Sequence, residues 1–307
     1  MRGFEKTYPR SAVCLTGTIL TIGLCVKNAE RTIKHSVDSL IYQDYPRENM
    51  EILIVDGRSE DRTLEIVKSM MAATNTRYRV YSDEGKGLGL ARQIVVDKAC
   101  GKYILYIGSD VVLPRDFLRK QLDFIERNQN VGAAIPRSEY AKSEGNIVAD
   151  VQSLLLSSVK NISNGTLFRK RALDEINGFD AKIIGASEDR DVLLRLRFAG
   201  WKAAENPLAT FCQIRDERLK DVYLRGFWYG YGDHFTHHKH RSAIKIPYWL
   251  PPTYVLWGIK ISFRAHSRYG EKKSFLIPLL CLFSSIGWCL GFVKAHMAEY
   301  GHKIEDN

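Results

Sequence analysis

The sequence predicts an α/β protein whose mainly parallel sheet is flanked by helices and followed by C-terminal helices that contact a membrane. Three observations support this expectation. Short apolar runs alternate with helix-spaced segments over roughly the first 200 residues, 45% of the 307 residues are hydrophobic, and 19 consecutive residues near the C-terminus carry no charge. A chain of this length can bury a domain of about 200 residues and still hold an appendage.

Strands are expected where β-branched and aromatic residues form short apolar runs. Five such runs occur in the order "TILTIGLCV" (18–26), "EILIVD" (51–56), "YRVYS" (78–82), "YILYIGSD" (103–110) and "GAAIP" (132–136). Runs that are apolar nearly throughout are typical of strands buried on both faces of a sheet.

The segments between these strands have the spacing of crossover helices. Apolar residues recur at helical intervals at Ile33, Val37, Leu40 and Ile41, and again at Ile66, Val67, Met70 and Met71. Repeated strand–helix–strand units give parallel strands with helices on both faces. Ligands bind such sheets beyond the carboxyl ends of the strands, where Asp56 and Asp110 are expected.

Asp110 follows the fourth strand and has two interpretations. As a turn residue, it accepts hydrogen bonds from its own turn and needs no ligand. As a metal ligand, it supplies the carboxylate oxygen that a divalent cation bridging a diphosphate requires at the rim of a cleft. The neighbouring motifs must decide between the two.

Five motifs follow one another between Thr21 and Trp201. They read "TIGLCVKNAERTIKHSVDSLIYQDYP", "EILIVDGRSEDRT", "GKGLGLARQIVVDKACGKYILYIGSD", "NGTLFRKRALDEINGFD" and "GASEDRDVLLRLRFAGW". In this order and at this spacing the chain resembles glycosyltransferase family 2, the inverting nucleotide-sugar enzymes of the GT-A fold. The resemblance covers about two thirds of the chain and implies a sugar transferase that uses Mg²⁺ or Mn²⁺.

The resemblance also implies roles for individual residues. Asp56 would bind the base or ribose of the nucleotide, and Asp110 would be the metal-binding acid of the family's D-x-D motif. Glu188 and Asp189 would be the family's "ED" pair, with Asp189 as the catalytic base. An inverting displacement needs a carboxylate opposite the leaving diphosphate to take the proton of the acceptor. Asn164 would lie near the sugar on the acceptor side.

Two positions depart from the family's pattern. The triplet that usually reads acid, any residue, acid is Gly108, Ser109 and Asp110 here, so the first carboxylate is missing and Ser109 offers the nucleotide only a neutral oxygen. Gly57 stands where another acid commonly follows Asp56. These departures leave a rival class open, a membrane-associated scaffold with a degenerate, non-catalytic transferase domain.

The acids of "GASEDRDVLLRLRFAGW" have a structural explanation as well. Ser187 makes a good N-cap, Glu188 and Asp189 favour the positive end of a helix, and Asp191 can pair with Arg195 four residues later. The structural and catalytic interpretations are compatible, because an acid held in a capped first turn is preorganised.

Two further motifs have weaker signals. In "EGKGLGLARQ" the glycines allow a close approach to a nucleotide and Lys86 or Arg92 can offset phosphate charge; the alternative is a flexible turn before a helix that begins near Leu88. In "DHFTHHKH" (233–240) the histidine spacing fits no strong zinc pattern. We therefore expect a solvated basic face there.

Basic residues are concentrated in the C-terminal third. The formal net charge is +10, and the segment 215–273 holds 12 lysines and arginines against 5 acids. Arg225 can meet the phosphate of an acceptor, or its helix can lie on anionic lipid headgroups. A nucleic-acid-binding protein is the other rival class that this charge leaves open, but we expect no nucleic acid as a partner.

The uncharged run at 275–293 has the length of a transmembrane helix. A buried helix or an interfacial hairpin is the alternative, and residues 246–263 suit an interfacial or re-entrant segment. Basic residues precede the run, which predicts a catalytic domain on the cytoplasmic side of the cell membrane. Six cysteines without a CxxC pair are expected to be reduced thiols, in keeping with that side.

The expected organisation therefore has three regions. Residues 1–213 form the GT-A catalytic domain, 214–270 an interfacial helical region, and 271–307 a transmembrane helix with a short tail. The expected function is transfer of a sugar from a UDP- or GDP-linked donor to a membrane lipid or lipid-linked acceptor, either a saccharide or polyprenyl phosphate.

Overall fold

The computed structural model describes residues 17, 19–159, 164–240 and 250–301 of the chain. Its sheet has eight strands in the order β3-β2-β1-β4-β7-β6-β8-β5. In chain order these strands are β1 (Leu20–Val26), β2 (Met50–Asp56), β3 (Arg77–Ser82), β4 (Tyr103–Ile107), β5 (Val111–Val112), β6 (Val131–Glu139), β7 (Leu167–Arg169) and β8 (Lys202–Gln213).

The first four strands of the sheet order are parallel, as the sequence predicts. β2 pairs with β3 and β1, and β1 pairs with β4. β7 then runs antiparallel to both β4 and β6, while β5 runs antiparallel to β8. The carboxyl ends of β1 to β4 therefore meet at one edge of the sheet, which is where Asp56 and Asp110 lie.

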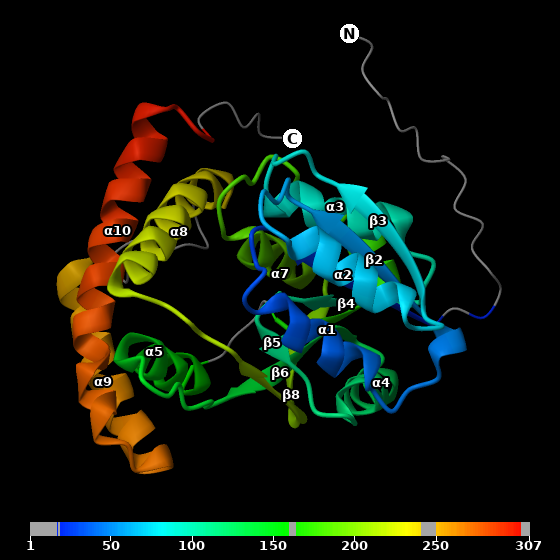
Figure 1. The fold of residues 1–307 in the computed structure, drawn as a ribbon. Coiled ribbons are helices and arrows are strands. Elements are labelled where there is room, and N and C mark those ends of the chain that lie inside the picture. The colour runs from blue at the N-terminus through cyan, green and yellow to red at the C-terminus, as the bar shows by residue number, and fades with distance from the viewer. Residues whose placement is uncertain (1–16, 18, 160–163, 241–249, 302–307) are drawn as a thin grey trace, which may run out of the picture.

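Helices cover both faces of the sheet (Figure 1). One face packs against α1 (Ile33–Ile41), α2 (Thr63–Ala72) and α4 (Phe117–Arg127). The other face packs against α3 (Leu88–Lys98), α6 (Lys170–Glu175) and α7 (Glu188–Phe198). This two-sided coverage explains why the central strands are apolar throughout.

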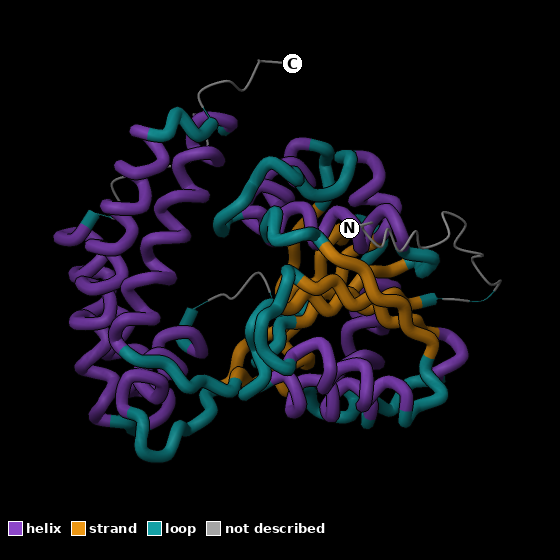
Figure 2. The backbone as a smooth tube through the Cα atoms, turned by 45° about the horizontal axis from the view of Figure 1, so that its top comes forward, coloured by secondary structure: helices purple, strands orange, loops and turns teal. Residues whose placement is uncertain are grey.

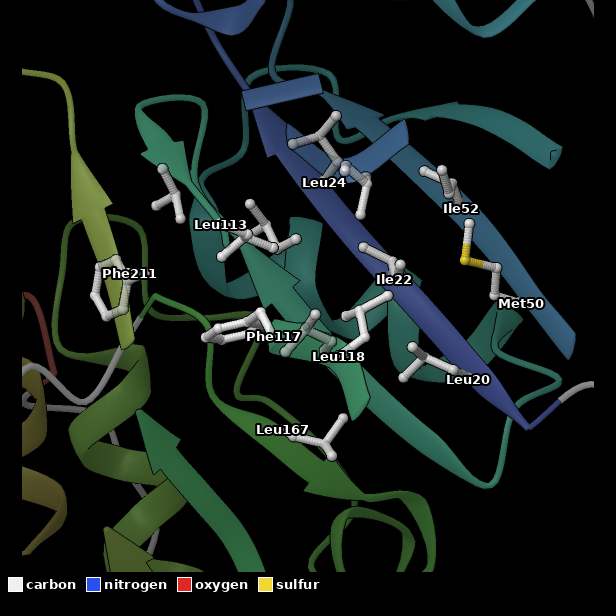
Figure 3. Packing of buried hydrophobic residues seen from close by; sticks show 14 of the residues in the cluster. Leu20, Ile22, Leu24, Met50, Ile52, Leu113, Phe117, Leu118, Leu167 and Phe211 are labelled. Carbon is white, nitrogen blue, oxygen red and sulfur yellow. The ribbon is translucent and has the colours of Figure 1, made fainter. Parts of the chain in front are cut away.

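The core on the first face is built from alternate residues of the central strands. Leu20, Ile22 and Leu24 of β1 lie beside Met50 and Ile52 of β2 (Figure 3). The side chains of α4 and β8 complete this cluster, including Phe117, Leu118 and Phe211. All of these residues are at most 1% exposed, so the sheet is a rigid platform for the loops at its edge.

The C-terminal helices stand to one side of the sheet (Figure 2). They are α8 (Leu219–Lys239), α9 (Pro251–Tyr269), the short 3-10 helix η3 (Lys272–Leu276) and α10 (Ile277–Met297). Together with α5 (Ile147–Ser157) they form a third apolar cluster. The part of the predicted interfacial segment that the structure describes is the regular helix α9, and residues 246–249 lie outside the described residues.

Glycines bring α8 and α10 into backbone contact. A Cβ atom on Gly226 or Gly230 of α8 would lie 2.1 Å from the Ser284 carbonyl or 1.9 Å from the Trp288 carbonyl of α10. Gly287 of α10 has an equivalent close approach to the backbone of α8. Small residues four apart permit this close packing, so α10 lies against α8 and does not stand apart from the rest of the chain.

The cysteine prediction is wrong at one position. Cys25, Cys212, Cys281 and Cys289 are free thiols, but Cys100 is disulfide-bonded. Sequence spacing carries no information on which thiols meet in space, because pairing depends on the distance between Cα atoms. Cysteine usage therefore does not support a cytoplasmic location.

Candidate active site

Asp110 lies in the turn that connects β4 to β5. Because β5 pairs with β8, the end of β8 comes beside Asp110: Gln213 Nε2 donates to Asp110 Oδ2 at 3.1 Å, and the Ile214 N–H donates to the Asp110 carbonyl at 2.8 Å. Ser109 and Asp110 line a cavity of 330 Å³ with Lys27 and Arg92. The carboxylate is thus positioned by a second strand and faces an open space.

Two arginines form the cationic side of this site. Arg215 donates to Gln213 Oε1 at 2.8 Å and to Glu217 at 2.6 Å, and Arg225 of α8 pairs with the same Glu217 oxygen. Burial raises the pKa of Asp110, and the charge of Arg215 is the main influence that lowers it. The site can therefore hold one carboxylate and still attract an anionic ligand.

Asn164 occupies the space left by the missing first acid. A Cβ atom on Gly108 would lie 2.7 Å from Asn164 Oδ1 and 2.9 Å from Asp110 Oδ1. The amide oxygen of Asn164 thus approaches the strand tip where the family usually has a carboxylate. Asn164 also lines both cavities that Asp110 lines, so the residue predicted for the acceptor side lies beside Asp110.

The two acids of the "ED" pair have different surroundings at the start of α7. Glu188 is buried and pairs with Arg92 of α3 at 3.0 Å, while the Arg92 guanidinium also lies over the rings of Tyr106 and Phe179. Burial raises the pKa of Glu188 to about 7, with Arg92 opposing and Asp189 reinforcing the shift. The observed role of Arg92 is therefore to pair with Glu188. Its predicted contact with phosphate stays a prediction.

Asp189 is half-buried and lines the large cavity. Its Oδ1 accepts a hydrogen bond from the Arg190 N–H at 2.7 Å. Asp189 lies in the first turn of α7, at the positive end of the helix dipole. Of the two acids, Asp189 is the one with access to a bound molecule.

Asp191 and Ser187 have structural roles. Asp191 is buried and accepts from Arg195 Nε at 2.9 Å, which confirms the predicted pair, and also from His240 Nε2 at 2.8 Å. Ser187 precedes the helix, but its side chain makes no cap bond and donates to Asp233 of α8 instead. The capping prediction for Ser187 is wrong because its left-handed backbone (φ 80°) turns the side chain away from the helix.

The large cavity has a volume of 660 Å³ and two chemically different sides. Its polar side is lined by Asp110, Asn164, Asp189, Arg190, Arg215 and Arg225. Its apolar side is lined by Leu155, Val159, Val222, Tyr254, Trp257 and Leu280, from α5 or just after it and from α8, α9 and α10. The C-terminal helices therefore supply part of the wall around the two acids.

A neighbouring cavity of 490 Å³ lies over the carboxyl ends of β1 and β2. It is lined by Lys27, Gly57, Asp83, Gly87 and Trp228, among others. Asp56 lies beside this cavity and accepts from the Ser59 hydroxyl at 2.6 Å. Lys86, in contrast, is exposed and pairs with Glu84 at 3.6 Å, and it does not line these cavities.

Sequence reasoning missed several residues that line these cavities. Asp83 directly follows the third strand, and its position at the same sheet edge as Asp56 was a usable signal. Arg215 lay in the basic segment, but nothing in the sequence showed that it follows a strand next to Asp110. Gln213 had no signal at all, since its place depends on the pairing of β5 with β8.

The donor set around Asp110 fits a hard divalent cation. The nearby ligand atoms are oxygens, the carboxylate of Asp110 and the amide oxygen of Asn164. Mg²⁺ and Mn²⁺ prefer such oxygens, and Mg²⁺ is usually held by one or two carboxylates together with substrate phosphates. One carboxylate at the rim of the cavity meets that requirement.

The model of the family described as "Glycosyl transferase family 2" matches residues 21–178. The chain belongs to glycosyltransferase family 2. The match includes Asp56, Asp110 and Asn164 but ends before the acids of α7. The protein is thus a glycosyltransferase with the GT-A fold, as the sequence predicts.

Curated relatives of this glycosyltransferase share about a quarter to a third of the aligned residues. An uncharacterized glycosyltransferase of Haemophilus influenzae is 28% identical over 60% of this chain and 67% of its own length. A Methanococcus voltae dolichyl N-acetyl-alpha-D-glucosaminyl phosphate 3-beta-D-2,3-diacetamido-2,3-dideoxy-beta-D-glucuronosyltransferase is 31% identical over 33% of this chain and 32% of its own. Beta-monoglucosyldiacylglycerol synthase of Synechocystis is 25% identical over 66% of this chain and 43% of its own.

Solved structures share the fold of this glycosyltransferase. The mannosyltransferase PcManGT from Pyrobaculum calidifontis, in complex with GDP-Man and Mn²⁺, superposes with a TM-score of 0.62 at 17% identity, covering 91% of this chain and 87% of that one. Residues 1–349 of TarS from Staphylococcus aureus, in complex with UDP-GlcNAc, superpose with a TM-score of 0.51 at 14% identity, covering 92% of both chains. The likeness includes the C-terminal helices, since it spans nine tenths of this chain.

Proposed function

We propose that this protein is a metal-dependent, inverting glycosyltransferase that moves a sugar from a UDP- or GDP-linked donor to a lipid-linked acceptor. The acceptor class is a lipid-linked saccharide or polyprenyl phosphate presented at a membrane, in glycan or glycolipid assembly. One observation carries this proposal: a single cavity joins Asp110 and Asp189 to an apolar wall made by α5, α8, α9 and α10.

The two sides of the cavity suit the two ends of such an acceptor. Arg215 and Arg225 supply cationic donors for phosphate oxygens, and the aromatic and aliphatic wall offers a place for the first units of a lipid tail. Within that wall the rings of Tyr254 and Trp257 stack, with 5.1 Å between their centroids. A water-soluble acceptor would gain little from an apolar wall of this extent, because burying apolar surface is favourable only for an apolar ligand.

The residues of the polar side have separate tasks in this proposal. Asp110 and Asn164 would hold the divalent cation, which when bound stabilises the charge of the leaving diphosphate. When the acceptor is a lipid-linked saccharide, Asp189 takes the proton of the acceptor hydroxyl as that oxygen attacks the anomeric carbon from the face opposite the leaving diphosphate. Glu188 and Arg92 hold the first turn of α7 in place from behind, and the cavity beside Asp83 and Asp56 receives the nucleoside.

The relatives support the choice of donor and acceptor. The structural neighbours hold GDP-Man and UDP-GlcNAc, one relative is named for a dolichyl N-acetylglucosaminyl phosphate, and another for a monoglucosyldiacylglycerol. No nucleic acid is part of this proposal, because the basic side chains of the site converge on a cavity that suits a phosphorylated small molecule.

We propose that α10 contacts lipid through one face. The helix Lys272–Met297 is long and apolar enough to span a membrane. However, Ile277 and Leu280 pack with α5, while just past the other end the Tyr300 hydroxyl donates to the Lys182 carbonyl. A bilayer cannot surround a helix that a folded domain covers along one side, so the proposal has α10 lying in one leaflet.

The open side of α9 and α10 has the composition of a membrane-facing surface. Its exposed apolar residues are Leu256, Ile259, Phe263, Phe275, Leu279, Leu282, Ile286, Leu290 and Val293. Basic residues of the same segment can reach anionic headgroups: Lys260, Arg264, Arg268, Lys272 and Lys273. The proposal keeps the bounds 1–213, 214–270 and 271–307 and the catalytic domain on the cytoplasmic side, where nucleotide sugars occur, but replaces the predicted transmembrane helix by a helix that lies in one leaflet.

A donor screen tests this function. We expect one nucleotide sugar to raise the melting temperature of the full-length protein in detergent, and to do so only with Mn²⁺ or Mg²⁺, because a ligand that binds only the native state stabilises it. In the Asp110→Asn variant the metal-dependent part should vanish, and transfer to a polyprenyl phosphate should fall by at least about 100-fold. A variant with normal transfer and normal metal dependence would refute the role of Asp110.

A further inference from the structure

Three histidines meet at the far end of the C-terminal helices, outside the cavities that hold the two acids. His234 and His238 lie on α8, and His296 lies on α10; one ring nitrogen from each lies within 4.8 Å of the others. His234 is buried, His238 half-buried and His296 exposed. The predicted solvated basic face is therefore wrong at His234, because α10 covers this side of α8.

The hydrogen bonding of His234 fixes which of its nitrogens can act as a metal ligand. Nδ1 lies 2.6 Å from the backbone carbonyl of Tyr300. A carbonyl oxygen only accepts, so Nδ1 carries the proton and Nε2 keeps its lone pair. A histidine that ligates a metal commonly donates its other N–H to a backbone carbonyl in this way, which orients the ring and raises its basicity.

The lone pair of His234 Nε2 points to the other helix. Nε2 lies 3.3 Å from Nδ1 of His296. Two nitrogens bound tetrahedrally to one zinc ion, each at about 2.0 to 2.1 Å, are separated by about 3.3 Å. The distance between these two nitrogens, which are in hydrogen-bond contact with each other, thus equals the separation that a shared zinc ion requires.

The third histidine has the spacing that a helical metal site needs. His238 is four residues after His234, so both side chains lie on one face of α8, and their ring centroids are 4.5 Å apart. A rotamer adjustment of the half-buried His238 ring completes a three-nitrogen set. Imidazole nitrogens suit zinc among the metals available to a cell, and a fourth position is left for water.

We propose that His234, His238 and His296 form a zinc site that fastens α10 to α8. The site also orders the turn after α10, because His234 holds the Tyr300 carbonyl while the Tyr300 hydroxyl accepts from the Ile184 N–H at 2.8 Å. Ile184 belongs to the segment just before the catalytic helix α7. The metal would therefore stabilise the attachment of the C-terminal helices to the catalytic domain.

Zinc titration of tag-free, full-length protein in detergent tests the proposal. We expect one zinc ion per chain by isothermal titration and elemental analysis, and a rise in melting temperature on the order of 5 °C at a hundredfold excess over Kd. Cobalt substitution should give the visible absorption of a tetrahedral nitrogen site. His296→Ala and His238→Ala should each weaken zinc binding by at least about 100-fold, since even the loss of an outer-shell partner costs 10- to 100-fold.

Matched variants separate this site from the catalytic one. His35→Ala removes an exposed histidine of α1 and should leave zinc binding unchanged. Asp110→Asn should also keep zinc binding, even if the proposed transfer reaction is disproved, because the histidines do not touch the catalytic cavity. Equal zinc affinity in wild type and in His296→Ala, or no zinc-induced stabilisation of the wild type, would overturn the proposal.

Discussion

At the scale of residues, two adjacent acids at the start of α7 have different surroundings. Glu188 is 2% exposed and tied to Arg92, whereas Asp189 faces the cavity. A carboxylate paired in the interior contributes to the fold, and removing its partner leaves a buried charge behind. A carboxylate that reaches a bound molecule can act as a base. The two acids therefore respond differently to loss of charge.

We predict that Asp189→Asn abolishes turnover and leaves the fold intact. Transfer should fall by about 100-fold to 10,000-fold, the usual contribution of a general base, while stability changes by no more than about 1 kcal/mol from the lost helix-dipole interaction. Glu188→Gln should instead keep most of the transfer rate, because Glu188 is 2% exposed, pairs with Arg92 and does not line the cavity. Chemical denaturation and single-turnover rates, measured side by side, distinguish the two; equal behaviour of the variants would reject Asp189 as the base.

The same scale explains why the missing first acid is not a simple defect. Gly108 has no side chain, and the Asn164 amide oxygen lies in the space that a side chain would fill. A carboxylate placed at Gly108 would meet both that oxygen and the Asp110 carboxylate. The two positions are therefore coupled, because a side chain at Gly108 would displace the Asn164 amide and the Asp110 carboxylate.

We predict that Gly108→Asp lowers transfer by about tenfold or more. Inserting atoms into a filled site typically costs about 1 to 3 kcal/mol, and 1.36 kcal/mol corresponds to a factor of ten in rate. Adding Asn164→Gly in the same chain should recover part of the loss, because it removes the contact at 2.7 Å. The measurement is the rate of the two single variants and the double variant at saturating metal; strictly additive losses would contradict the coupling.

At the scale of elements, α7 is joined to α8 by buried charge. Asp191 of α7 accepts from Lys239 and His240 at the end of α8, each at 2.8 Å, as well as from Arg195. Asp233 of α8 accepts from Arg190 of α7 at 2.6 Å and from the Trp288 indole of α10 at 2.9 Å. These contacts set the position of α8, and with it the wall of the cavity, relative to the catalytic helix.

This junction should make stability depend on pH in acid. Burial alone would raise the pKa of Asp191, but the hydrogen bond from His240 and the charge of Arg195 hold it well below its ordinary value. Because the folded-state pKa is lowered, the stabilisation is complete above the unfolded-state pKa of about 3.9 and is lost as the pH falls below it. We expect the difference in free energy of unfolding between wild type and Asp191→Asn to be about 3 to 5 kcal/mol near pH 6 and to shrink below about pH 4. A difference that stays constant down to pH 3 would contradict this.

At the scale of the whole molecule, the sheet and the C-terminal helices contribute different parts of the site. The sheet edge presents Asp56, Asp83 and Asp110, while α8, α9 and α10 close the cavity from the side. The outer face of those helices is apolar, and its basic neighbours are suited to anionic lipid. In our proposal this arrangement holds the cavity at the membrane surface, where a lipid-linked acceptor is presented.

We predict that Leu279→Glu combined with Leu290→Glu weakens binding to vesicles that contain phosphatidylglycerol by about 100-fold or more. Each leucine is 49% exposed on α10, and burying one leucine in lipid is worth about 1.5 to 3 kcal/mol. Leu208→Glu, at a 70% exposed leucine of β8, is the control and should bind like wild type. Vesicle flotation measures the effect. If Leu208→Glu lost as much vesicle binding as the double variant, this face would not be the one that makes the contact. The same conclusion would follow if the double variant stayed in the membrane fraction after alkaline carbonate extraction.

The predictable part of the protein follows from local patterns. All five predicted strands are present, because an apolar run bounded by turn residues is enough to define a buried strand. Asp56 and Asp110 were found because strand ends are visible in the sequence. The strands β5, β7 and β8 were not predicted, since β5 has two residues, β7 has three, and β8, although it has 12, is exposed over part of its length.

The sequence by itself determined the family, the parallel part of the sheet and the acids at its edge, because these depend on patterns that span a few tens of residues. Only the tertiary structure decided that Asn164 fills the space at Gly108, that Glu188 is neutralised by Arg92, and that His296 meets His234. Each of these pairs joins residues 56 to 96 positions apart. Such contacts are set by how helices and strands pack, and packing depends on the shape of both surfaces at once. A sequence pattern describes the surface of one helix or strand at a time. The side-chain pairs of the site therefore become visible only when the packing of these elements is known.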